Sequence, residues 1–131
     1  MPKYSNRSAI KLAECDERIQ RVFNTVIETV DNTILVGHRN QEDQEEMYET
    51  GRSQLQWPNS LHNSLPSKAV DVAPYPIDWN DRERFTLFAG YVLGVAENMG
   101  IKLRWGGDWD RDFKTSDNSF DDLVHFELLN D

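Results

Sequence analysis

The chain has 131 residues, of which 38% are hydrophobic and 11% aromatic, and its formal net charge is −9. This length and composition predict one domain, residues 1–131, with a packed core, and they exclude wholesale disorder. The acidic balance argues against a general nucleic-acid-binding protein and against attraction to an anionic membrane surface.

The N-terminal part of the chain is polar at first and then amphipathic. Residues 1–20 contain no signal-peptide core, and no apolar run approaches the length of a membrane span. We therefore expect no membrane insertion and a protein made in the cytoplasm that must be released to act elsewhere. Apolar residues at helical spacing predict one or two helices over residues 8–30, with a break near residues 14–16. Cys15, the single cysteine, lies on this apolar stripe and is expected to be a buried core thiol.

The middle of the chain alternates apolar and polar segments. Residues 32–38, NTILVGH, predict a short buried strand, and residues 40–51 predict a polar helix that ends at Gly51. Residues 52–68 have no sustained period and predict a long loop. Residues 69–76, AVDVAPYP, predict a strand that its prolines end.

The last third of the chain begins with the strongest helical pattern, residues 80–100, capped by Asn80 or Asp81. The side chains expected on its buried face are Phe85, Phe88, Val92, Val95, Ala96 and Met99. Strands are predicted at residues 101–107 and 123–129. Helices first, followed by strands interleaved with helices, predict an α+β domain with a small, mainly antiparallel sheet flanked by helices.

Two of the predicted strands carry a metal-binding side chain inside an apolar sequence. In AVDVAP, alternation puts Asp71 on the face opposite Val70 and Val72. In the last strand, alternation separates two groups: Leu123, His125 and Glu127 on one face, and Val124, Phe126 and Leu128 on the other.

A third candidate ligand, His62, lies in the loop that leads to Asp71. Histidine and carboxylate side chains from neighbouring segments are what a catalytic Zn²⁺ needs, with three protein ligands and one open position. Asp122, three residues before His125, could take a proton from the attacking water.

Spacing alone leaves other interpretations open. A His and an Asp on two strands are commonly surface or hydrogen-bonded groups. The 23 acidic residues also allow a glycosidase-like carboxylate pair to arise by accident. Neither a Gly-x-Ser-x-Gly nor a His-Glu-x-x-His motif occurs.

Four segments favour one interpretation of these His and Asp residues, a metal site: GHRNQEDQEEMY, SLHNSLPSKAVDVAPYPIDW, LRWGGDWD and FDDLVHFEL. In their order and content they resemble the zinc peptidases that cut peptidoglycan stem peptides. This group includes D-alanyl-D-alanine carboxypeptidases and the L-alanyl-D-glutamate endopeptidases of bacteriophage endolysins, and it shares its metal-site fold with the Hedgehog signalling domain. The similarity extends over residues 31–129, and DVAPYPIDW and RWGGDWD resemble the short phage endopeptidases most.

The resemblance implies a zinc ion held by His62, Asp71 and His125. It also implies that Asp122, in the family's acid-x-x-His pattern, is the general base that activates the attacking water. Arg39, in GHRNQEDQ, matches the arginine that stabilises the oxyanion. The spacing from His62 to Asp71 is longer than is common in the family, and the intervening NSLPSK contains no Gly. The loop can absorb extra residues because only its ends must converge on the metal.

Other residues near these motifs have weaker assignments. His38 is expected to be a structural residue at a strand end, and Asp121 is the neighbouring alternative for the general base. Glu127 either orients a metal ligand or forms a salt bridge. Trp105 and Trp109 either shape the cleft or belong to the core.

The function implied by the resemblance is that of a phage endolysin: a monomeric, zinc-dependent endopeptidase that cuts the L-alanyl-D-glutamate bond of the peptidoglycan stem peptide. We expect it to stay in the host cytoplasm until it is released to the cell wall. The alternatives are a D-alanyl-D-alanine carboxypeptidase or dipeptidase, and a non-catalytic wall-binding virion protein. A carboxypeptidase needs a cation for the terminal carboxylate of its substrate, and beyond Arg39 the motifs offer only Lys68 and Arg104. This scarcity favours the endopeptidase.

Overall fold

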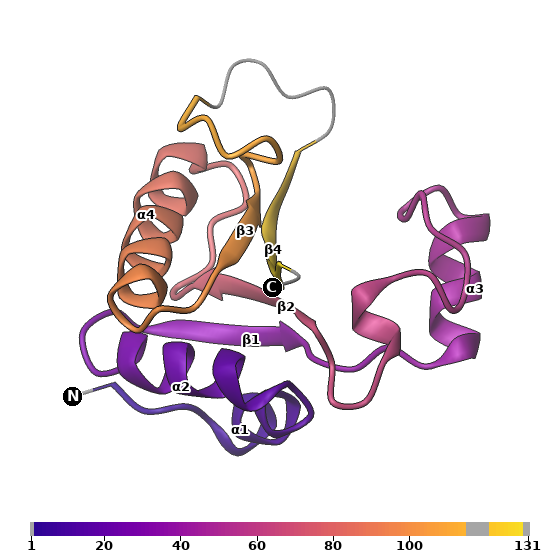
Figure 1. Ribbon diagram of the computed structural model, residues 1–131, viewed down its shortest axis with the longest axis horizontal. Helices are drawn as coiled ribbons and strands as arrows, with labels where there is room; N and C mark the ends of the chain where they lie inside the picture. Colours follow the sequence, from indigo (N-terminus) through magenta and orange to yellow (C-terminus); the bar gives the residue numbers. More distant parts are fainter. Residues whose placement is uncertain (1, 115–120, 130–131) are drawn as a thin grey trace.

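One antiparallel sheet forms the centre of the computed structural model, which describes residues 2–114 and 121–129 (Figure 1). The strands lie in the order β1-β2-β4-β3, and each neighbouring pair is antiparallel. They are β1 Asn32–Val36, β2 Ala69–Pro74, β3 Leu103–Gly106 and β4 Asp122–Leu128. Helices flank this sheet, so the predicted α+β class is confirmed.

The helices begin and end close to the predicted positions. They are α1 Asn6–Ala13, α2 Glu17–Val26, α3 Gln41–Glu49 and α4 Arg82–Asn98, with a short 3₁₀ helix, η1 Leu61–Asn63, in the loop before β2. The predicted break between the first two helices is confirmed. The Asp16 carboxylate caps α2 by accepting a hydrogen bond from the backbone N–H of Arg18. No helix in the described part of the chain is both long enough and apolar enough to cross a bilayer.

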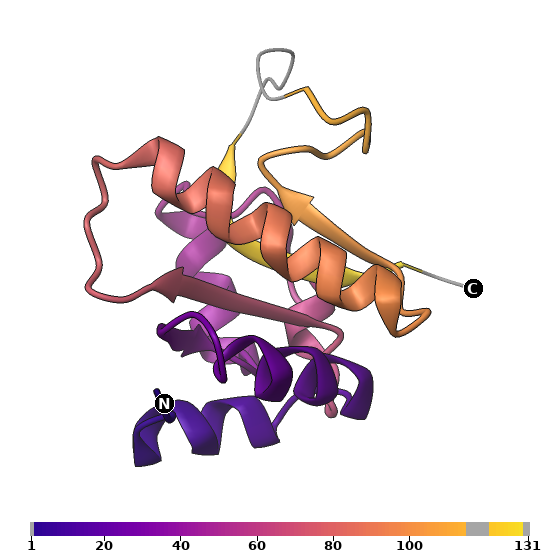
Figure 2. The ribbon, with the colours of Figure 1, turned by 90° about the vertical axis from the view of Figure 1, so that its left-hand side faces the viewer.

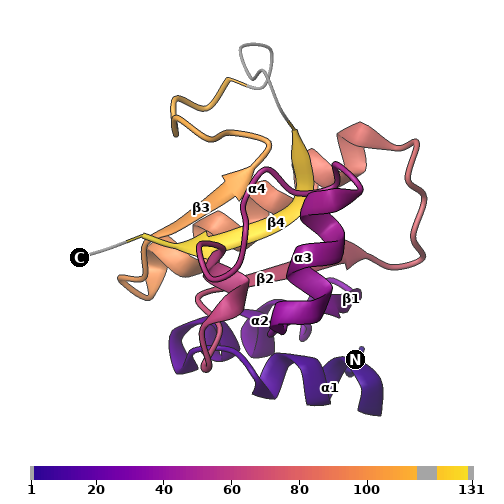
Figure 3. The same cartoon turned by 90° about the vertical axis from the view of Figure 1, so that its right-hand side faces the viewer.

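The two faces of the sheet have different surroundings. Helix α4 covers one face, whereas α3 and η1 lie beyond the other (Figures 2 and 3). The hydrophobic core lies on the α4 side, where the Phe126 ring of β4 packs edge-on against Phe23 of α2 and Phe88 of α4, at centroid distances of 5.6 and 6.3 Å. Val70 and Val72 of β2 belong to the same core. The alternate side chains of β2 and β4 are therefore available on the α3 side.

Strand β4 departs from regular alternation near its start. The register shifts between Trp105 and Gly106 of the facing strand, and Gly106 pairs with Asp122. A Cβ at Gly106 would collide with the carbonyl oxygen of Asp122, so only glycine fits there. Leu123, predicted to share a face with His125, packs against the hydrophobic core instead. That prediction is wrong because the irregularity interrupts the two-residue period of the strand.

Candidate metal centre

Asp71 and His125 meet because of the way β2 pairs with β4. The two residues are direct partners in the antiparallel register, which places their side chains next to each other on one face of the sheet. The next rung pairs Val70 with Phe126, and both are fully buried in the core on the opposite face. Burial of these apolar neighbours therefore holds the two polar groups in register.

His62 reaches the same face of the sheet from η1. The Ser60 hydroxyl caps this short helix by accepting a hydrogen bond from the backbone N–H of His62. Backbone hydrogen bonds then tie η1 to both flanking segments, from Arg39 N to His62 O at 2.8 Å and from Lys68 N to Leu61 O at 3.0 Å. The imidazole of His62 is only 2% exposed.

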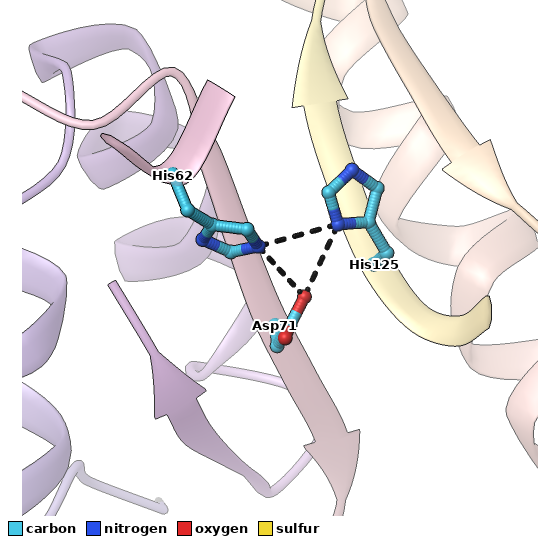
Figure 4. A group of neighbouring side chains, drawn as sticks. All are labelled: His62, Asp71 and His125. Atoms are coloured by element: carbon cyan, nitrogen blue, oxygen red, sulfur yellow. Dashed lines mark hydrogen bonds and ion pairs between the residues drawn. The ribbon is translucent and has the colours of Figure 1, made fainter. Parts of the chain in front are cut away.

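The three side chains converge on one point (Figure 4). His62 Nε2 lies 3.1 Å from Asp71 Oδ1, His125 Nδ1 lies 3.2 Å from the same oxygen, and the two ring nitrogens are 3.3 Å apart. A tetrahedral zinc ion with bonds of about 2.0–2.1 Å separates its ligand atoms by about 3.3 Å. The triangle of donor atoms therefore has the size that this ion requires, and the group could hold a metal.

The other nitrogen of each imidazole is already engaged. His62 Nδ1 lies 2.8 Å from the carbonyl oxygen of Gly37, and because a carbonyl only accepts, this nitrogen carries the proton. His125 Nε2 donates to Glu127 Oε1 at 2.7 Å. Once each ring gives up its second proton, the lone pairs of His62 Nε2 and His125 Nδ1 face Asp71 Oδ1. Both rings are thus oriented as metal ligands.

The electrostatics of the site favour a positive charge at its centre. Burial by itself would raise the pKa of the Asp71 carboxyl, but the charge of His62 and hydrogen bonds from both imidazoles hold it well below its usual range. Burial opposes protonation of His125, whereas hydrogen bonds to Asp71 and Glu127 favour it and raise the pKa of His125 to about 9. The same two carboxylates would stabilise a divalent cation.

Arg39 lies beside the carboxylate of Asp71. Its Nη2 is 3.6 Å from Asp71 Oδ2, on the oxygen that does not face the histidines, and the residue is 9% exposed. Gln44 of α3 fixes the guanidinium: its Oε1 accepts from Arg39 Nη1 at 3.0 Å and from Asn63 Nδ2 at 3.2 Å. Gln44 is fully buried, and its Nε2 donates to the carbonyl oxygen of Leu55 at 2.6 Å.

Sequence reasoning assigned no role to Gln44. It is the one buried residue of α3, a helix without an apolar stripe, so no hydrophobic period marks its position.

The two adjacent carboxylates at the start of β4 have different surroundings. Burial and the negative charge of Asp71 raise the pKa of the Asp122 carboxyl, while the charges of His125, His62 and Arg39 lower it, with a net rise. Asp122 is therefore within the electrostatic field of the candidate metal ligands. Asp121, by contrast, is exposed, and its Oδ2 forms an ion pair with Arg82 Nη1 of α4 at 2.7 Å.

The remaining predicted residues divide between the site and the scaffold. His38 has structural contacts: its Nδ1 bonds to the carbonyl oxygen of Ser64, and its backbone N–H donates to Glu14 Oε1. Trp105 is 3% exposed and belongs to the core. The Trp109 ring lies 5.5 Å from the ring of His125, at the edge of the site.

A cavity of about 510 Å³ borders the site between the end of β1 and α3. Asp71, Arg39 and Met47 of α3 form part of its wall. A ligand bound in this cavity would therefore lie next to Asp71 and Arg39.

The loop after β3 holds a second group of potential ligands, the carboxylates of Asp108, Asp110 and Asp112. Its donors are all oxygen atoms, and Asp110 and Asp112 are exposed. Exposed acidic groups commonly gather without a metal, whereas the buried group of two imidazoles and one carboxylate has the mixed donor set of a catalytic zinc site.

Comparison with known proteins points to one activity. The sequence model of the phage L-alanyl-D-glutamate peptidase family matches residues 1–129. The chain is 33% identical over 113 residues to the L-alanyl-D-glutamate peptidase of Escherichia phage T5, and the match covers 82% of each chain. Its fold is similar to the crystal structure of the L-Ala D-Glu endopeptidase ChiX of Serratia marcescens, with a TM-score of 0.76 and 27% identity. That match covers 96% of this chain and 89% of ChiX.

Proposed function

Because the chain belongs to the phage L-alanyl-D-glutamate peptidase family, we propose that it is a zinc-dependent endopeptidase that cuts the L-alanyl-D-glutamate bond of peptidoglycan stem peptides. The family predicted from the four sequence motifs is confirmed. The observation that carries the choice of zinc is the convergence of two imidazole nitrogens and one carboxylate oxygen at 3.1, 3.2 and 3.3 Å. Magnesium and calcium prefer sites made of oxygen atoms only.

In this proposal the residues of the chain bind the metal, move a proton and stabilise a developing charge. His62, Asp71 and His125 hold zinc, which when bound polarises a carbonyl and makes water nucleophilic near neutral pH. Asp122 accepts the proton of the attacking water and passes it to the leaving amine, a role that its raised pKa supports. Arg39 donates to the substrate oxygen that becomes negative, and Gln44 holds the guanidinium ready for this.

The surroundings of the nearby cations support an endopeptidase rather than a carboxypeptidase. A free terminal carboxylate needs an available cation, and two candidates are already paired. Lys68 Nζ lies 3.1 Å from Asp16 Oδ2, and Arg104 Nη2 lies 2.6 Å from Glu127 Oε2. An internal peptide bond needs no such partner.

We further propose that residues 1–131 act as a single catalytic domain and as a monomer. The partner is the stem peptide, reached from the host cytoplasm once a path to the cell wall has opened. With a formal charge of −9, the chain is not attracted to the anionic wall over a long range. Recognition would therefore depend on short-range contacts in the cavity beside Asp71 and Arg39.

Mass spectrometry of purified muropeptides after digestion tests the proposed bond. Cleavage should leave a disaccharide that carries L-alanine alone and release a peptide with a new D-glutamate N-terminus. A chain with His125→Ala serves as the inactive control. Release of free D-alanine with the L-alanyl-D-glutamate bond intact would identify a carboxypeptidase. Muropeptides that stay whole, in the presence of zinc, would identify a non-catalytic wall-binding protein.

A further inference from the structure

Glu127 and Arg104 form an ion pair directly behind the candidate ligand His125. Glu127 is 8% exposed, and its two carboxylate oxygens have different partners. Oε1 accepts from His125 Nε2 at 2.7 Å, and Oε2 accepts from Arg104 Nη2 at 2.6 Å. The carboxylate thus joins an arginine to the imidazole whose other nitrogen faces Asp71.

The sheet itself builds this arrangement. Glu127 follows His125 by two residues in β4, so both side chains lie on the same face of the strand. Arg104 of β3 is the direct register partner of Glu127, as Asp71 of β2 is of His125. Two rungs whose side chains share one face of the sheet therefore hold the His125 ring from both sides, through Asp71 at Nδ1 and through Glu127 at Nε2.

Arg104 is in turn held in place by Trp109. The guanidinium carbon lies 5.5 Å from the centre of the Trp109 ring, and Nη1 bonds to the Trp109 carbonyl oxygen at 3.5 Å. The same Trp109 ring packs 5.5 Å from the ring of His125. The contacts form a closed circuit in which each side chain limits the movement of the next.

We propose that Glu127 and Arg104 are positioning residues for the metal: Glu127 keeps His125 in the tautomer whose Nδ1 lone pair faces the ion, and Arg104 keeps Glu127 in place. This inference rests on the metal site in the proposed function. Carboxylates that accept a hydrogen bond from a metal-binding histidine orient the ring and make it a stronger ligand. Their loss typically weakens metal affinity about 10–100-fold.

Zinc dissociation constants, measured by competition with a chelator, test this proposal. Glu127→Ala should weaken zinc binding about 10–100-fold, and Glu127→Gln, which keeps an acceptor oxygen, should weaken it less. Arg104→Met should also weaken binding. In the Glu127→Ala background, Arg104→Met should cause no further loss, because Arg104 acts through Glu127.

Arg82→Met is the matched control. It also removes an arginine–carboxylate pair beside β4, but the carboxylate belongs to Asp121, which is exposed and precedes β4, whereas Glu127 lies directly behind the His125 ring. Zinc affinity should therefore stay at the wild-type value. Thermal unfolding of each metal-free variant checks that it is folded, and the nearly isosteric Glu127→Gln keeps the test decisive if Glu127→Ala does not fold.

The possible results separate the two proposals. A wild-type chain that binds no zinc would overturn the metal site of the proposed function. A wild-type chain that binds zinc, with Glu127→Gln and Glu127→Ala binding it equally well, would overturn the positioning role alone. An additive loss in the double variant would overturn the action of Arg104 through Glu127.

Discussion

Replacing Asp122 with Asn tests the proton-transfer step with little change in shape. Asn cannot accept the proton of the attacking water, and general bases contribute about 10²–10⁴-fold to rate, which corresponds to about 2.7–5.4 kcal/mol of transition-state stabilisation. The variant should retain zinc, because the three converging ligand atoms belong to His62, Asp71 and His125. Turnover should therefore fall by two to four powers of ten at unchanged metal content.

Asp121→Asn is the control for this prediction, because it changes the adjacent carboxylate in the same way. Asp121 pairs with Arg82, and the side chains of Arg82 and Asp121 are 45% and 32% exposed. Ion pairs this open to solvent contribute about 0–1 kcal/mol to stability, so Asp121→Asn should leave both the fold and the turnover close to wild type. Muropeptide turnover, measured by chromatography together with the zinc content of the same samples, decides whether Asp122 or Asp121 is the general base. Near wild-type turnover in Asp122→Asn together with an inactive Asp121→Asn would refute the assignment of the base.

Three further predictions concern the metal, the oxyanion and the pH dependence of stability. Asp71→Ala should lose both bound zinc, measured by elemental analysis, and activity; an active variant would contradict the ligand set. Arg39→Lys keeps the charge but not the forked donors, so turnover should fall at little-changed KM, with a loss of up to about 2.7–4 kcal/mol; normal turnover would make Arg39 structural. Asp16→Asn removes a carboxyl group whose pKa is held below its usual range, first by its hydrogen bond with Arg18 and also by its hydrogen bond with Lys68. Because the folded-state pKa is lowered, this stabilisation is present above the unfolded-state pKa of about 3.9 and disappears as pH falls. The difference in unfolding free energy between wild type and Asp16→Asn should thus stay constant from about pH 7 to about pH 5 and shrink below about pH 4; a constant difference down to about pH 2 would contradict it.

Local chemistry explains why most helices and strands could be predicted from the sequence. The break before α2 depends on Asp16 and the backbone of the next residues, and the end of α3 depends on Gly51, which has φ +77. The irregularity at Leu123 could not be predicted in this way. It depends on the fit of Gly106, in another strand, against the backbone of Asp122.

The site residues also divide into those that the local sequence reveals and those that depend on contacts between distant segments. Asp71 and His125 are recognisable because each interrupts an apolar strand, and a buried carboxylate there needs a reason. Gln44 and Arg104 have no such signature. Gln44 contacts Leu55 and Asn63 through the folded loop. Arg104 meets its partner 23 residues away, and only the register of β3 with β4 reveals that contact.

The long spacing between His62 and Asp71 is compatible with the metal site because the two ligands are positioned by different means. Asp71 is fixed by its strand register with His125, which does not depend on the loop. His62 is fixed by two backbone hydrogen bonds that η1 accepts, from Arg39 N to His62 O and from Lys68 N to Leu61 O. Residues added between these anchors lengthen only the segment that leaves η1 and returns to β2, at a small cost in loop-closure entropy. A change of register between β2 and β4 by one residue, in contrast, would turn Asp71 into the core and separate it from His125.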